Sequence, residues 1–259
     1  MSKRLSLNLA TLYPADMEHK LYAAGAAGFR AVGLLLSDLV REGQAALQEL
    51  RLSQLAVAEI VGVAGWADLD RATRAVAIRR AEEAFELAAK VRAALVVAEA
   101  PATPLDDVML ADRFGELCRV AQSHGVRVGL EFVGSAAQVK NLASAWQVVE
   151  AAGMENGGLV IDTFHFYQGE SSVEMLDPIP GERILLIQVA DCMEMPKYEL
   201  RNRHRVHPGM GAIAFEPLLA ALYEKSYQGY YSLELYNEDY WLEDPIVVAK
   251  DGMRSLRRL

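Results

Sequence analysis

The chain has 259 residues, of which 52% are hydrophobic and 24% charged, and its formal net charge is −9 at pH 7. This length and composition are typical of a globular protein with one large core. The negative charge argues against nucleic acid or an anionic membrane surface as the main partner.

Two further features of the composition limit the class of protein. The two cysteines, Cys118 and Cys192, are too few for a disulfide framework and lack zinc-knuckle spacing, so each is expected to be a small buried apolar residue. No apolar run approaches the roughly 18 residues that a membrane span requires. The N-terminal segment alternates polar and apolar residues and has no signal-peptide core. We therefore expect a cytoplasmic protein without a membrane partner.

Short apolar runs alternate with helical patterns along the chain, and eight of these runs predict strands. They are Leu5–Thr11, Ala31–Leu36, Leu55–Gly62, Ala94–Ala100, Arg127–Val133, Gly158–His165, Ile184–Cys192 and Tyr230–Tyr236. The later runs are continuously apolar, as expected for parallel strands covered by helices. Eight βα units without a Gly-rich dinucleotide fingerprint favour an α/β fold of the (β/α)8 TIM-barrel type over a doubly wound open sheet. A single domain is expected over residues 1–259.

Helices are predicted between these runs from apolar residues at helical spacing. One stripe is formed by Leu110, Phe114, Leu117 and Ala121, and another by Phe215, Leu218, Leu219, Leu222 and Tyr223.

Capping residues mark where the helices begin and end. Asp16 is expected to cap the first helix, with Gly25 and Gly28 at its end. Pro104 or Leu105 should open the helix that His124-Gly125 closes.

Two segments are longer than a simple connection requires. Ala64–Ala75 follows the third predicted strand, and Met193–Gly211 follows the seventh. Because the loops after the strands build the active face of such a barrel, substrate contacts are expected in these segments.

Four polar residues lie near the ends of the last four predicted strands. Glu131, Asp162, Gln188 and Glu234 each end or nearly end an apolar run. A single carboxylate in such a run is often a solvated strand end, but four on consecutive strands are hard to assign to chance. Burying four oxygen ligands is costly unless a positive charge holds them, so the pattern predicts a divalent metal at the barrel mouth.

Three carboxylates and one amide oxygen form a hard ligand set. Such a set suits Mn²⁺ or Mg²⁺ and is compatible with Co²⁺, whereas zinc is less favoured without an imidazole or thiolate. Asp191 lies at the same rim and is a candidate partner of the ligands. Glu59 and Glu99 also fall in strand-like runs, but we expect them to be barrel or rim residues with basic partners rather than ligands.

Several segments in the second half of the chain carry a family resemblance. These are Leu130-Glu-Phe-Val-Gly, Leu159-Val-Ile-Asp-Thr-Phe-His-Phe, Arg205-Val-His-Pro-Gly-Met-Gly-Ala-Ile and Ser232-Leu-Glu-Leu-Tyr. Together they resemble the sugar isomerase/epimerase superfamily with the xylose-isomerase-like barrel. Within it, the sequence is most similar to the inosose isomerase group and, almost as closely, to the bacterial 3-dehydroshikimate dehydratases.

The resemblance implies roles for individual residues. Glu131, Asp162 and Glu234 match metal ligands, and Gln188 stands where many isomerases of the family have histidine, a pattern that also looks like the dehydratases. His165 matches the histidine of the Asp-Ser-Phe-His motif, with Thr163 in place of serine. The alternative for His165 is a core or ligand-supporting residue.

The long loop after the seventh predicted strand is basic. Arg205 matches the substrate-binding arginine of the family, and His207 follows it in the same motif. The alternative for this basic segment is a solvated surface. Trp66, Tyr236 and Trp241 are candidates for an apolar wall of the pocket, with simple packing as the alternative.

The predicted chemistry is proton removal from carbon next to a carbonyl. Glu131 and Glu234 are expected to act from opposite faces of the substrate in an isomerase, whereas His165 is the favoured base in a dehydratase. The first prediction is a metal-dependent isomerase or epimerase of a small polyhydroxy ketone, of the kind used in inositol catabolism, and the alternative is 3-dehydroshikimate dehydratase. A non-catalytic barrel is a minor alternative. Abasic-site DNA repair, which uses a histidine-rich zinc cluster, is disfavoured. A small polyol or ketose is the expected partner, and a homo-oligomer is left open.

Overall fold

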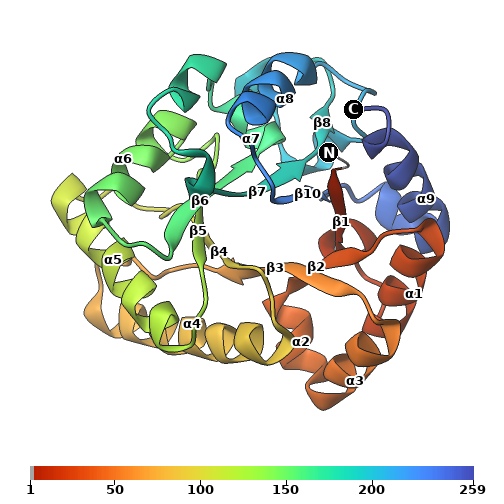
Figure 1. Cartoon of the computed structure of the whole chain (residues 1–259), viewed down its shortest axis with the longest axis horizontal. Coiled ribbons are helices and arrows are strands. Elements are labelled where there is room, and N and C mark those ends of the chain that lie inside the picture. The colour runs from red at the N-terminus through yellow and green to blue at the C-terminus, as the bar shows by residue number, and fades with distance from the viewer. Residues whose placement is uncertain (1–2) are drawn as a thin grey trace.

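Eight parallel strands close into a barrel in the computed structural model, which describes residues 3–259 (Figure 1). The strands are β1 (Arg4–Asn8), β2 (Ala31–Leu35), β3 (Ala56–Val63), β4 (Val96–Glu99), β5 (Val128–Glu131), β6 (Gly157–Asp162), β7 (Ile184–Val189) and β10 (Tyr230–Leu233). Their order around the barrel is β1-β10-β7-β6-β5-β4-β3-β2. This confirms the single-domain TIM barrel, and each predicted apolar run overlaps one strand of the barrel.

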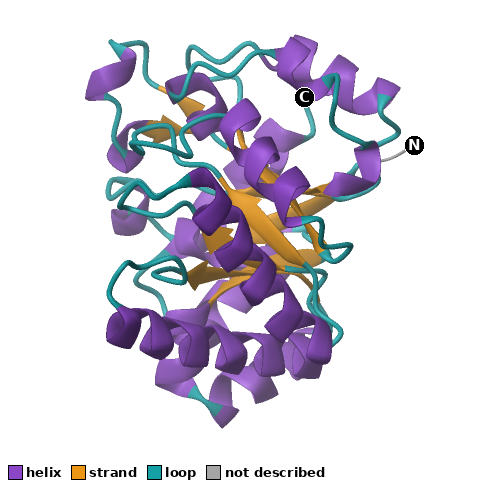
Figure 2. Cartoon of the chain, turned by 90° about the vertical axis from the view of Figure 1, so that its left-hand side faces the viewer, coloured by secondary structure: helices purple, strands orange, loops and turns teal. Residues whose placement is uncertain are grey.

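Helices surround the strands on the outside of the barrel (Figures 1 and 2). They are α1 (Met17–Ala27), α2 (Leu36–Glu42), α3 (Gln44–Ser53), α4 (Arg71–Val91), α5 (Asp107–Ser123), α6 (Leu142–Ala152), α7 (Thr163–Gln168), α8 (Phe215–Glu224) and α9 (Pro245–Leu256). No helix in the described part of the chain has the length and apolar character needed to cross a membrane.

The predicted helical stripes face the core, with one exception. The four residues predicted for α5 are all buried. In α8, Phe215, Leu218 and Leu222 are buried, but Tyr223 is 82% exposed, because it lies at the edge of the stripe near the end of the helix.

Some predicted boundaries move by a few residues. Asp16 caps α1 by accepting a hydrogen bond from His19 N, and Gly28 ends that helix with a φ of 90°, whereas Gly25 lies inside it. The start predicted for α5 is wrong, because the cap is Asp106 and not Pro104 or Leu105. The loop predicted at Ala64–Ala75 is shorter, since α4 already begins at Arg71.

A small two-stranded sheet stands beside the barrel rim. It pairs β8 (Asp191–Cys192) with β9 (Arg205–Val206) in antiparallel fashion. The Asp191 carboxylate accepts hydrogen bonds from the backbone N–H groups of Gly209, Gly211 and Ile213. Asp191 therefore fixes the turn that follows Arg205, and its carboxylate is engaged by this backbone rather than by the predicted ligands as we expected.

Close packing between neighbouring strands leaves no room for a side chain at Gly158. A Cβ there would lie 2.6 Å from the backbone oxygen of Arg183 and 2.6 Å from Leu185 Cγ. Gly158→Ala should therefore lower the free energy of unfolding by about 1–3 kcal/mol, as overpacking does. Urea titration followed by circular dichroism measures this change.

Gly25→Ala is the matched control. A Cβ at this position inside α1 meets nothing within 4 Å, so the substitution should leave the protein as stable or add about 0.5–1 kcal/mol. Equal stability of the two variants would contradict the packing described for β6.

Candidate active site

A cavity of about 410 Å³ opens at the rim where the strands end. Acidic, basic and imidazole side chains line it together: Glu99, Glu131, Glu234, Arg201, Arg205 and His165. Active sites of TIM barrels lie at this carboxyl end of the strands. This cavity is therefore the candidate active site.

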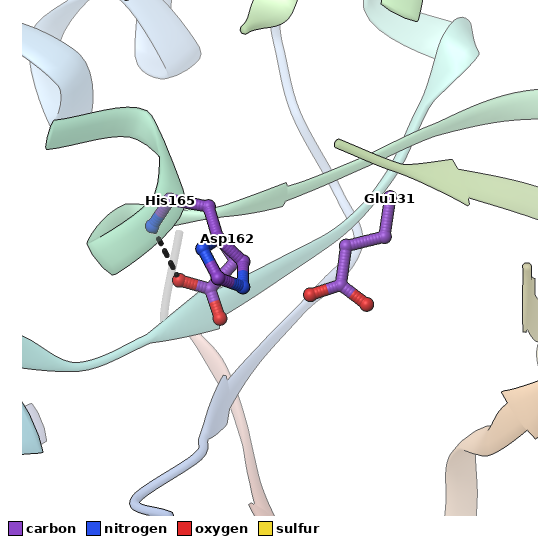
Figure 3. A group of neighbouring side chains, drawn as sticks. All are labelled: Glu131, Asp162 and His165. Atoms are coloured by element: carbon purple, nitrogen blue, oxygen red, sulfur yellow. Dashed lines mark hydrogen bonds between the residues drawn. The ribbon is translucent and has the colours of Figure 1, made fainter. Parts of the chain in front are cut away.

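Glu131 and His165 line this cavity, and Asp162 lies close to both of them (Figure 3). One ligand atom of each lies within 4.8 Å of the others, and all three side chains are buried. Asp162 ends β6 and caps α7, where its Oδ1 accepts hydrogen bonds from Phe164 N at 2.7 Å and His165 N at 3.0 Å. Because β6 runs directly into α7, the aspartate and the histidine are held on one rigid turn.

Glu234 and Gln188 lie together, since Gln188 is on β7 and Glu234 follows the end of the neighbouring strand β10. Gln188 Nε2 donates to Glu234 Oε1 at 3.0 Å, and Asn8 Nδ2 donates to the same oxygen at 2.8 Å. Gln188 Oε1 is buried and has no hydrogen-bond partner among the described residues. A buried amide oxygen without a partner is costly, so this atom is available to a bound cation.

Arg205 is the buried cation of the site. Its Nη1 lies 2.7 Å from Asp162 Oδ2 and 3.8 Å from Glu234 Oε2, and its Nη2 lies 3.4 Å from His165 Nε2. Its guanidinium also stands over the ring of Phe164, 4.5 Å from the centroid. The predicted loop arginine therefore does reach the site, but it binds the acidic side chains there.

The buried carboxylates outnumber this arginine. Burial, and then the charge of neighbouring carboxylates, raises the pKa of Glu131 and of Glu234 well above the usual range. Burial is the largest influence on the pKa of Asp162 and acts to raise it, but the charges and hydrogen bonds of Arg205 and His165 together outweigh burial and lower that pKa. Three buried carboxylates, one arginine and the free amide oxygen of Gln188 are a set that a divalent cation would complete.

The short-distance cluster shares only Glu131 and Asp162 with the predicted ligand set. It contains His165, whereas Glu234 is not within the same distance of all three members. Arg205 Nη1 stands between Asp162 and Glu234. The structure thus brings Glu131 and Asp162 directly together and links Glu234 to them through the arginine.

Two residues predicted to bind substrate do not line the cavity. Trp66 is buried, donates from Nε1 to the backbone oxygen of Glu99 at 2.9 Å, and packs on Phe114. His207 packs on Tyr240 with ring centroids 4.7 Å apart. The interpretation of these two as substrate-binding residues is not supported by their positions, because both side chains are used in packing. Tyr236 does line the cavity.

Sequence reasoning missed the polar network beneath the site. Asn8 Nδ2 donates to Glu59 Oε1 at 3.2 Å as well as to Glu234, and Ser232 Oγ donates to Glu59 Oε1 at 2.7 Å. A Cβ at Gly33 would lie 2.0 Å from Glu59 Oε1, so glycine is needed to make room for this side chain. The signal was present, since Asn8 is a polar residue inside an apolar run.

Glu59 has neutral partners in place of the basic partner that we expected. It is fully buried, and burial raises its pKa to about 7. The protonated carboxyl is therefore favoured in the folded state, and folding stability should fall as the pH rises from about 4.5 to about 7. The stability lost through this residue can reach about 3 kcal/mol.

Glu59→Gln should remove this part of the pH dependence, because glutamine mimics the neutral acid. The unfolding free energy of the variant minus that of the wild type should be larger at pH 8 than at pH 5. Urea titrations in the presence of a chelator measure this difference. Glu224→Gln, on the exposed end of α8, is the control and should show no such change. The same difference at both pH values would contradict a neutral Glu59.

Comparison with known proteins places this site in a family. The xylose isomerase-like TIM barrel model matches residues 21–259. Inosose isomerase of Halalkalibacterium halodurans is 37% identical over 140 residues, which are 52% of this chain and 50% of that protein. 3-Dehydroshikimate dehydratase of Pseudomonas aeruginosa is 30% identical over 251 residues, which are 93% of this chain and 39% of that protein. The chain therefore spans half or less of the length of these curated relatives.

Solved structures share the fold. A zinc-bound IolI protein has a TM-score of 0.91 at 23% identity and covers 98% of this chain, with 97% of its own length matched. A fusion of a xylose isomerase-like TIM barrel with a 4-hydroxyphenylpyruvate dioxygenase has a TM-score of 0.90 at 25% identity over 99% of this chain and 42% of its own. The curated relatives are enzymes, namely isomerases and dehydratases. The chain belongs to the xylose isomerase-like TIM barrel family.

Proposed function

We propose that the chain is a divalent-metal-dependent enzyme that removes a proton from the carbon next to the ketone of a small polyhydroxy ring compound. The observation that carries this proposal is the excess of buried carboxylates over buried cations at the barrel rim, beside an imidazole in the same cavity. An arrangement of this kind is costly to fold unless a cation completes it.

Glu131, Asp162, Gln188 and Glu234 are the residues that would hold the metal. All four offer oxygen atoms, which favours Mn²⁺ or Mg²⁺ and is compatible with Co²⁺. Zinc becomes the better fit only if His165 is a ligand, as the short distances in the Glu131–Asp162–His165 group allow. When bound, the cation would supply positive charge for the negative charge that develops on the carbonyl oxygen as the proton leaves.

His165 is the proposed base. Burial lowers its pKa to about 4, so the imidazole is neutral near pH 7. Because Arg205 can only donate, the Nε2 atom that it approaches at 3.4 Å is the nitrogen that carries the lone pair, and this lone pair faces the arginine. We therefore assign to Nε2 the acceptance of the proton, a step in which Arg205 gives up its contact with this atom.

Glu234 is better suited to holding the metal than to moving a proton. Its Oε1 accepts two hydrogen bonds, from Asn8 and Gln188, and its Oε2 faces Arg205. A carboxylate fixed by three neighbours keeps its orientation during a reaction. Glu131 accepts no hydrogen bond from the described residues, so it remains the second candidate for proton transfer.

Loss of water is the outcome that we favour after proton removal, as in a 3-dehydroshikimate dehydratase. The C–H proton passes to His165 Nε2, the C–O bond on the adjacent carbon breaks, and the departing oxygen takes the proton back and leaves as water. Similarity to the dehydratase extends over 93% of the chain, whereas similarity to the inosose isomerase covers 52%. Gln188 among the proposed ligands agrees with this choice.

Isomerisation of an inosose-like ketone is the second candidate. It was the first prediction from the sequence, and it is favoured by the higher local identity of 37% to the inosose isomerase. Both reactions begin with the same proton removal. They differ in whether the proton returns to carbon or a hydroxyl group leaves.

The metal site can be tested without any substrate. Glu131→Gln should greatly reduce the rise in melting temperature on adding Mn²⁺, because tight binding to the folded state raises stability and a lost carboxylate ligand weakens it. Glu99→Gln is the matched control, since Glu99 lines the same cavity but is not among the proposed ligands. An equal response of the two variants would contradict the ligand set.

The reaction can be tested with 3-dehydroshikimate and Mn²⁺. Formation of a catechol acid, followed by its ultraviolet absorbance, is the expected result, and His165→Asn should lower kcat about 10²–10⁴-fold while metal binding persists. Deuterium from D₂O entering an inosose, with no catechol formed from dehydroshikimate, would instead establish the isomerase.

A further inference from the structure

A second arginine, Arg201, lines the same cavity as Arg205 but differs from it in burial and in its ion-pair partners. Arg205 is fully buried and engaged by Asp162 and Glu234. Arg201 is exposed at the cavity wall and has no acidic side chain within 4.0 Å among the described residues. It is thus the cation of this cavity that a ligand could still bind.

The backbone of the loop between β8 and β9 holds Arg201 in place. Its Nη1 donates to the backbone oxygens of Tyr198 at 2.9 Å and Leu200 at 2.7 Å. Leu200 is fully buried, and Gln168 Nε2 from α7 donates to its oxygen at 3.0 Å. The loop is therefore tied to the same helix that carries His165, while Arg201 Nε and Nη2 make no hydrogen bond to a described residue.

The acidic lining of the cavity makes this arginine important for the binding of an anion. Glu99, Glu131 and Glu234 line the cavity in a chain of net charge −9, so an anion entering it meets repulsion. An unpaired guanidinium with two free donor nitrogens offers a carboxylate charge-assisted hydrogen bonds. A neutral polyol would gain little from it.

We propose that Arg201 binds the carboxylate of the substrate and thereby selects an acidic ring compound over a neutral one. This inference rests on the proposed function, because it assigns an anionic substrate to the same cavity. It makes Arg201 a specificity-determining residue and leaves proton transfer to His165.

Two non-reactive probes that differ only in a carboxylate test this proposal. They are 3,4-dihydroxybenzoate and catechol, titrated by calorimetry into the Mn²⁺-loaded protein. Wild type should bind the acid about 10–100-fold more tightly than catechol, as charge-assisted hydrogen bonds predict. Arg201→Gln should abolish this preference, and Arg201→Lys, which keeps the charge but not the planar fork, should retain part of it.

Arg203→Gln is the matched control on the same loop. Arg203 is exposed, contacts His204 and does not line the cavity, so its loss should leave the preference for the acid unchanged. Equal binding of both probes by the wild type, or an unchanged preference in Arg201→Gln, would overturn the role of Arg201.

The binding test separates this inference from the proposed function. A preference for the acid that depends on Arg201, in a protein that forms no catechol from dehydroshikimate, would support the arginine's role and reject the dehydratase. Catechol formation at the wild-type rate and KM in Arg201→Gln would support the dehydratase and reject the arginine's role.

Discussion

An excess of buried negative charge at the barrel rim is the constraint on which the site depends. Arg205 pairs closely with Asp162 and less closely with Glu234, and within residues 3–259 Glu131 has neither an ion-pair partner nor a hydrogen-bond donor. The folded chain responds by raising the pKa of Glu131 and Glu234, so that part of the charge is removed by protonation. A bound dication would reverse this response, because it favours the ionised form of each ligand. Metal binding and proton release should therefore be linked at this rim.

The barrel backbone holds these charged side chains close together. Parallel register places Asp162 beside Gln188, and it places Glu131 beside Glu99 on the next strand. Since every strand of the closed barrel pairs with a neighbour on each side, the strand ends hold these side chains without relying on mutual attraction. Asn8 extends the same support from β1 by joining Glu234 to the neutral Glu59.

The sequence was sufficient for the barrel and for the residues at its strand ends. Continuous apolar runs marked each strand, and a carboxylate at the end of such a run is visible without a structure. Contacts made by the β8–β9 excursion were not visible, because they depend on how Asp191 folds the chain back over the rim. For that reason the interaction of Arg205 with Asp162 was not foreseen, and the packing of His207 on Tyr240 was missed. The place of Trp66 could not be predicted from the sequence, because an aromatic residue in a long loop looks the same whether it lines a cavity or packs behind one.

The two arginines of the cavity have separate roles, which explains how a rim rich in carboxylates can accept a substrate that itself carries a carboxylate. Arg205 is bound by Asp162 and Glu234, which sets the arrangement of the proposed metal ligands, while burial is the main cause that keeps His165 neutral near pH 7. Arg201 remains unpaired on the loop that is tied to α7 through Gln168, so the proposed base and the proposed carboxylate-binding group share one support. A shared support fixes the distance between the end of the substrate that is recognised and the carbon that reacts, which is what orientation contributes to catalysis. Within this family of barrels, a change of one loop arginine could then alter the substrate while the oxygen ligands and the proton-transfer step stay the same.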